Sequence, residues 1–145
     1  MLQKGFTLIE ILLVSAITVL LIAATLPVYD SFFKQGKLDV ASIELQGNLR
    51  NMQAQAKAGL NDLDQGAYFN SNSYIAYQGS SYVTRNTDYD FTYDIIDKVT
   101  IVDAPMEVTF SKKTGLPDSA QTITIRNQIN DEETVINVSA IGLIE

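Results

Sequence analysis

One ionisable side chain, Glu10, stands inside a long apolar run near the start of the chain. The run extends from Phe6 to Leu26 and reads FTLIEILLVSAITVLLIAATL. A carboxylate inside an apolar segment is costly unless it is protonated or paired with an opposite charge, so Glu10 is a candidate functional group. Glu10 also lies near the end of the run, where it can reach water at a membrane interface. From the residues alone both interpretations stay open: a carboxylate that binds a partner, or one that is solvated at the interface.

The flanks of the run indicate which kind of segment it is. Phe6 to Pro27 comprises 22 residues, which as an α-helix measure about 33 Å, enough to cross a bilayer core. A secretory signal peptide has a shorter apolar region followed by a small-residue cleavage site, and neither feature is present. The possible processing point therefore precedes the run, between Gly5 and Phe6. Lys4 is the positive charge before it and is typical of a cytoplasmic N-terminus.

The stretch Lys4-Gly5-Phe6-Thr7-Leu8-Ile9-Glu10, followed by ILLVSAITVLLIAATLP, resembles the class III leader and N-terminal helix of type IV pilins and pseudopilins. The resemblance covers about Lys4 to Pro27. It implies that prepilin peptidase cleaves between Gly5 and Phe6 and N-methylates Phe6. It also implies that Glu10 faces the terminal amine of Phe6 on a neighbouring subunit during assembly.

The same resemblance implies a location and a set of partners. The subunit would be a single-pass protein of the inner (cytoplasmic) membrane with its head outside the cytoplasm, and would later join an extracellular or periplasmic filament. Its partners would be other pilin or pseudopilin subunits, prepilin peptidase, the inner-membrane assembly platform and, before assembly, membrane lipid.

Composition argues against several other classes of function. The chain contains no Cys and no His, which removes disulfides, thiol chemistry and the commonest general base. No Gly-rich phosphate loop and no G-x-S-x-G motif is present, so we predict no enzyme, no catalytic residue and no cofactor. The net charge of −7 disfavours nucleic acid as a partner, because DNA binding requires clusters of Lys or Arg.

Two acidic segments are candidate cation sites. Asp62, Asp64 and Gly66 resemble the start of a calcium loop, but the later ligands of that motif are missing. Asp88, Asp90, Asp94 and Asp97 gather in one stretch, for which a solvated acidic face and a binding surface for a cation or basic partner both stay open. We assign no metal site.

The elements that carry these residues begin with a long helix. Pro27 predicts a kink, because proline removes one helical hydrogen bond and clashes with the preceding turn. The helix then resumes and runs to Ala58, with Gly59 as its C-cap. Apolar residues recur at steps of three and four on one face, namely Leu38, Ala41, Leu45, Leu49, Met52 and Ala56.

The rest of the chain is predicted to form a β-rich head. Residues 59–72 are rich in Asn, Asp and Gly and indicate a loop. Alternating segments rich in Tyr, Ile, Val and Thr predict strands at 73–78, 80–85, 91–95, 98–102, 106–110, 122–126 and 135–138. Turns are expected at Gly79-Ser80 and at Asn86-Thr87-Asp88. The last third reads as an antiparallel meander with one face on the helix.

The fold class is therefore α+β: a long N-terminal α-helix packed against an antiparallel β-sheet head, the pilin fold. We expect four parts, which are a leader peptide at 1–5, a transmembrane or filament-core helix at 6–27, an amphipathic continuation at 28–59 and the globular head at 60–145.

A second resemblance concerns the end of the chain. VTFSKKTGLP, TITIRN and ETVINVSAIGLI are similar to the C-terminal strands of the GspH/FimT group of minor pilins and pseudopilins, and LQGNLRNMQAQAKAG resembles that group's helix before the head. The function expected from both resemblances is a minor structural subunit of a type IV pilus-like filament or a type II secretion pseudopilus. The alternative is a DNA-uptake or adhesive minor pilin at a filament tip.

Overall fold

The computed structural model describes the backbone of residue 5 and of residues 7–145, and the side chains of residues 5, 7–24 and 36–145. Residues 1–4 of the predicted leader and Phe6 lie outside the described residues. The chain divides into two compact units, Met1–Lys34 and Gln35–Glu145. Helix α1, Leu8–Ala58, contributes to both units, which are described separately below.

The first unit contains the apolar part of α1. Its described side chains, from Leu8 to Ala24, are exposed to solvent, including large apolar ones such as Leu8 and Leu20. Within the part of the chain that the structure describes, we find no helix with the length and apolarity needed to cross a bilayer.

The second unit confirms the predicted amphipathic stripe. All six residues of the stripe are buried, the most exposed being Ala41 at 7% and the least exposed Leu49 and Ala56 at 0%. Gly59 adopts the left-handed conformation with φ 67°, and its N–H donates to the carbonyl of Ala56. This is the αL geometry expected at a helix C-terminus, and a short 3-10 helix, Leu60–Asp62, follows.

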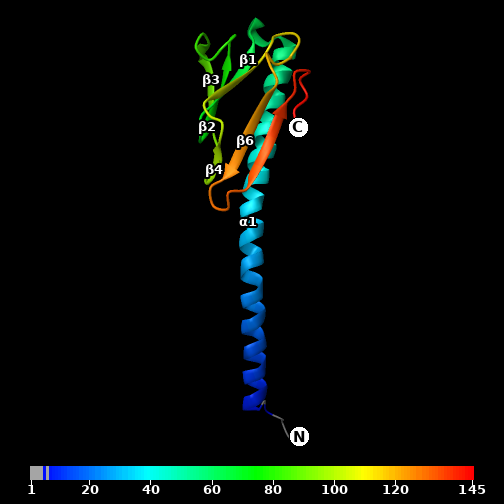
Figure 1. Cartoon of the computed structure of the whole chain (residues 1–145), viewed down its shortest axis with the longest axis vertical. Helices are drawn as coiled ribbons and strands as arrows, with labels where there is room; N and C mark the ends of the chain where they lie inside the picture. The colour runs from blue at the N-terminus through cyan, green and yellow to red at the C-terminus, as the bar shows by residue number, and fades with distance from the viewer. Residues whose placement is uncertain (1–4, 6) are drawn as a thin grey trace. The chain divides into compact units, whose positions relative to one another are not determined.

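Seven strands form two antiparallel sheets beside this part of α1 (Figure 1). The first sheet has the order β3-β2-β1-β5 and the second the order β4-β6-β7. Their bounds are β1 Gln65–Phe69, β2 Ser73–Gln78, β3 Asn86–Asp94, β4 Val99–Ile101, β5 Met106–Phe110, β6 Gln121–Asn127 and β7 Glu133–Val138. The helix and both sheets bury their apolar faces in one core, so the α+β architecture is confirmed.

The loop predicted at 59–72 is wrong, because it contains the central strand β1. Ala67 and Phe69 of β1 are fully buried, and β1 pairs with β2 on one side and β5 on the other. Gly66 lies opposite Tyr77, and a Cβ there would come within 2.4 Å of the tyrosine ring. The glycine that suggested a loop is therefore a strand residue that leaves room for an aromatic neighbour.

The strand predicted at 80–85 is also wrong. This segment is a loop that folds back over the sheet, where the ring of Tyr82 stacks on Tyr68 with centroids 3.8 Å apart, and Val83 is left 89% exposed. The turn predicted at 86–88 is instead the start of β3. Contacts with other elements override the local β propensity here.

The predicted meander of the last third is only partly correct. Strands β6 and β7 pair as expected, but β5 pairs with β1 and not with β6. Residues 111–120 therefore carry the chain from one sheet to the other.

We predict that the head loses stability at alkaline pH, because two of its tyrosines are buried. Burial raises the pKa of Tyr74 and of Tyr77 to about 12, and their hydroxyl groups lie 2.6 Å from Asn48 Nδ2 and Thr109 Oγ1. A raised pKa means that the folded state favours the neutral phenol over the tyrosinate. The stability that the two neutral phenols contribute is therefore complete below about pH 10 and is lost as the pH rises through about 12.

We expect the free energy of unfolding to fall by about 2 kcal/mol per tyrosine between pH 10 and pH 12. Denaturant titrations of the full chain in detergent at stepped pH, followed by tyrosinate absorbance, would measure it. The double variant Tyr74→Phe/Tyr77→Phe should show a flatter profile, and an equally steep one would contradict the assignment to these two residues.

Candidate functional site

Thr7 and Glu10 form a capping box at the start of helix α1. The Glu10 Oε2 atom accepts hydrogen bonds from the backbone N–H and the hydroxyl of Thr7, both at 2.8 Å. In return, the backbone N–H of Glu10 donates to Thr7 Oγ1 at 3.3 Å. Thr7 is the N-cap, and Glu10 stands three residues later, so each side chain satisfies a donor that the first turn leaves without a helical partner.

This arrangement adds a role for Glu10 that the sequence analysis missed. The sequence predicts that the carboxylate binds a neighbouring subunit or interfacial water, whereas in the structure it binds its own helix terminus. The signal was in the sequence, because Thr-x-x-Glu before an apolar run is the usual pattern of a capping box. Glu10 remains exposed, so the capped carboxylate is still accessible to a partner.

The other predicted site residues lie in or near this first unit. Gly5 is exposed, and a Cβ built on it would have no atom within 4 Å. Its partner in the predicted cleavage, Phe6, lies outside the described residues. The backbone of α1 is helical through Pro27, but the side chains of residues 25–35 lie outside the described part, so the kink at Pro27 stays a prediction.

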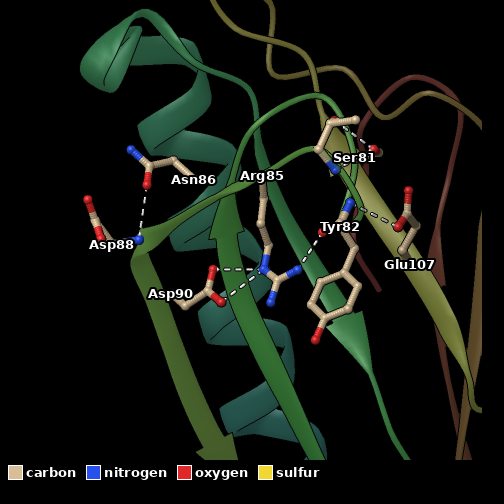
Figure 2. Close-up of polar contacts among 8 residues, drawn as sticks. Ser81, Tyr82, Arg85, Asn86, Asp88, Asp90 and Glu107 are labelled. Atoms are coloured by element: carbon tan, nitrogen blue, oxygen red, sulfur yellow. Dashed lines mark hydrogen bonds and ion pairs between the residues drawn. The ribbon is translucent and has the colours of Figure 1, made fainter.

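The acidic stretch of the head contains an ion pair that fixes the loop at 79–85 (Figure 2). Arg85 Nε donates to both carboxylate oxygens of Asp90, at 3.0 and 2.9 Å, and Arg85 Nη1 donates to the carbonyl of Tyr82. The guanidinium carbon also lies 3.7 Å from the centre of the Tyr82 ring. The backbone N–H of Tyr82 donates to Glu107 on β5. Asp90 is thus a structural partner of Arg85 in strand β3.

In the candidate calcium segment, the carboxylates are paired with groups of Lys112 and Lys113. Lys112 Nζ lies 3.1 Å from the carboxylate of Asp62, and the backbone N–H of Lys112 donates to Asp64 Oδ1 at 2.7 Å. Lys112 and Lys113 lower the pKa of Asp62, the hydrogen bond from Lys112 contributing most. Among the residues that the structure describes, no group of three or more acidic side chains is arranged to hold a metal ion.

Comparison with known proteins identifies the N-terminal segment and the fold. Residues 1–26 match the family model described as the prokaryotic N-terminal methylation motif. The structure is similar to that of the minor pseudopilin EpsH from the type 2 secretion system of Vibrio cholerae, with a TM-score of 0.54 and 13% sequence identity. The match covers 75% of this chain and 94% of that one. A search of curated proteins finds no match.

The N-terminal segment is thus similar to a methylation motif, and the fold is similar to that of a pseudopilin. EpsH is a minor pseudopilin, the class of protein that the C-terminal strands also resemble. At 13% identity the likeness shows the fold, and the role of this chain in a filament is a matter of proposal.

Proposed function

We propose that this chain is a minor subunit of a type II secretion pseudopilus or a related type IV pilus-like filament. The observation that carries the proposal is the match of residues 1–26 to the N-terminal methylation motif. The pilin-like fold of the rest of the chain is consistent with it. We infer the subunit role from the resemblance to pilins and pseudopilins, and the minor role from the likeness to a minor pseudopilin.

In this proposal prepilin peptidase removes residues 1–5 and methylates the new amine of Phe6. The apolar segment 6–27 holds the unassembled subunit in the inner membrane, with the head outside the cytoplasm, until the assembly platform transfers it to the filament. The exposed apolar side chains between Leu8 and Ala24 then need other surfaces to bury them. Helices of neighbouring subunits supply such surfaces.

The capping box suggests how Glu10 passes between the two states. In the free subunit the bonds from Thr7 offset part of the cost of placing a carboxylate in an apolar segment. During assembly the methylated amine of a neighbouring Phe6 brings a full positive charge to the same carboxylate. The attraction between opposite charges in an apolar environment favours one register of packing over the others.

Processing of the chain tests the proposal directly. The intact mass of the protein from its native membranes should correspond to loss of residues 1–5 and addition of one methyl group. Gly5→Val should accumulate as the unprocessed chain, because it changes the residue at the predicted cleavage point, while a Cβ at this position meets no other atom. Gln3→Ala is the matched leader control and should be processed normally. Cleavage near residue 26, or a native chain that retains Met1, would contradict the proposal.

A further inference from the structure

A polar groove of about 120 Å³ lies in the head between helix α1 and strand β3. It is large enough to hold several water molecules. Its lining combines amide side chains with aromatic rings. The principal members are Asn51 and Gln55 from α1, Gln78 from β2, and Tyr89, Phe91 and Tyr93 from β3.

The amide side chains on the helix side make hydrogen bonds within the head and still have donor or acceptor groups that a ligand could use. Asn48, which also lines the groove, donates from Nδ2 to the hydroxyl of Tyr74 at 2.6 Å, and this bond leaves its carbonyl oxygen to accept. Gln55 Nε2 and Asn51 Oδ1 are 3.5 Å apart, at the limit of a hydrogen bond. The Asn51 side chain is exposed and can turn its donor group and its acceptor group to a ligand.

A fourth amide, that of Gln78, approaches from the sheet. The Gln78 carbonyl oxygen accepts from Asn61 Nδ2 at 2.8 Å. This bond orients the amide group of Gln78 and leaves its nitrogen to donate to a ligand. The groove therefore offers donors and acceptors from two sides.

The aromatic wall is ordered by its neighbours. Tyr93 stacks on the buried Tyr74 with centroids 5.0 Å apart, and Phe91 lies 4.7 Å from Tyr93 at an angle of 56°. Phe91 is nevertheless 60% exposed and Tyr89 45% exposed. Asp90, between these two residues, is held by Arg85 (Figure 2). The backbone that carries both exposed rings is thus anchored from the opposite side.

We propose that this groove binds a neutral carbohydrate, with one sugar ring lying against Phe91 and Tyr89 and its hydroxyl groups bonded to the amides of Asn51, Gln55 and Gln78. A sugar presents apolar C–H faces, which pack on aromatic rings, and hydroxyl groups, which donate and accept as the amide groups do. None of the described side chains that line the groove is charged. A neutral ligand therefore fits its chemistry better than an anion or a cation, which would enter without a compensating charge. The inference is independent of the filament to which the subunit belongs.

The test is a titration of the isotope-labelled full chain in a detergent without a sugar headgroup, such as dodecylphosphocholine. The probes are glucose, galactose, mannose, N-acetylglucosamine and N-acetylgalactosamine, each taken to high millimolar concentration. We expect at least one of them to shift backbone amide signals from residues 48–55 and 89–93 in a saturable way. Glucuronate and the peptide Gly-Ser-Gly serve as charged and peptide controls.

Two variants localise the binding, each with a matched control. Asn51→Ala and Phe91→Ala should weaken binding at least about tenfold, since each removes one side of the contact. Gln128→Ala and Ile129→Ala replace exposed residues in the turn after β6 and should bind as the unchanged chain does. An unaltered amide spectrum outside the groove shows that each variant is folded.

Three results would overturn the inference. They are the absence of saturable shifts with all five sugars, unchanged binding by both groove variants, and equal or stronger shifts with glucuronate or Gly-Ser-Gly. The last of these outcomes would assign the groove to an anion or to a protein segment.

Discussion

Replacing Glu10 with glutamine should leave the subunit in the membrane and exclude it from filaments. Glutamine is the neutral counterpart of glutamate and also serves in a capping box. The variant therefore keeps the hydrogen bonds at the start of α1 that Glu10 makes with Thr7. What it loses is the negative charge that, in our proposal, binds the amine of a neighbouring Phe6.

Three other variants separate the charge from the cap. Glu10→Ala loses both and should assemble no better than Glu10→Gln. Glu10→Asp keeps the charge on a shorter side chain and should be intermediate. Thr7→Ala removes the cap and keeps the carboxylate. It should cost about 1 kcal/mol of helix stability and still enter filaments.

The measurement is the ratio of subunit in the sheared filament fraction to subunit in the membrane pool, with processing checked by intact mass. We expect Glu10→Gln and Glu10→Ala to lower this ratio at least about tenfold, which corresponds to losing about 1.4 kcal/mol of docking free energy. If Glu10→Gln enters filaments at the normal ratio and Thr7→Ala does not, the capping role of Glu10 is the important one and the charge-docking proposal is wrong.

Leu49→Ala should destabilise the head by about 2–5 kcal/mol, the usual cost of truncating a fully buried leucine. Leu49 is 0% exposed and belongs to the core formed by α1 and the two sheets. The cost combines lost apolar burial with the cavity that remains. Since domains of this size are stable by only about 5–15 kcal/mol, much of the stability of the head depends on this one side chain.

Ile43→Ala is the matched control, since Ile43 is an aliphatic residue in the same helix but is 70% exposed. It should change the free energy of unfolding by less than about 0.5 kcal/mol. Chemical denaturation of the full chain in detergent, followed by aromatic circular dichroism, measures both. Equal effects of the two substitutions would mean that the apolar stripe of α1 does not pack on the sheets.

The features that depend on neighbouring residues were predictable from the sequence. The N-terminal motif is a run of consecutive residues, and a family model recognises it over residues 1–26. The stripe from Leu38 to Ala56 is a helical repeat, so its burial followed from spacing alone. Gly59 ended the helix as expected. The capping box is also a local feature, because its Thr-x-x-Glu pattern lies within four consecutive residues.

The features that depend on distant residues were decided by the tertiary structure. β1 looked like a loop because Gly66 weakens a strand, yet the ring of Tyr77 needs the space that Gly66 leaves. Residues 80–85 looked like a strand, yet the Arg85–Asp90 pair and the stacking of Tyr82 fold them back over the sheet.

The division into two sheets, and the groove that Asn51 and Phe91 both line, likewise required knowing which strands pair and where the helix lies against them. The physical reason is that a strand gains its stability from partners far away in the chain, whereas a helix satisfies its backbone within four residues. The order of neighbouring residues therefore determined the motif and the helix, and only long-range packing determined the sheets and the surfaces between them.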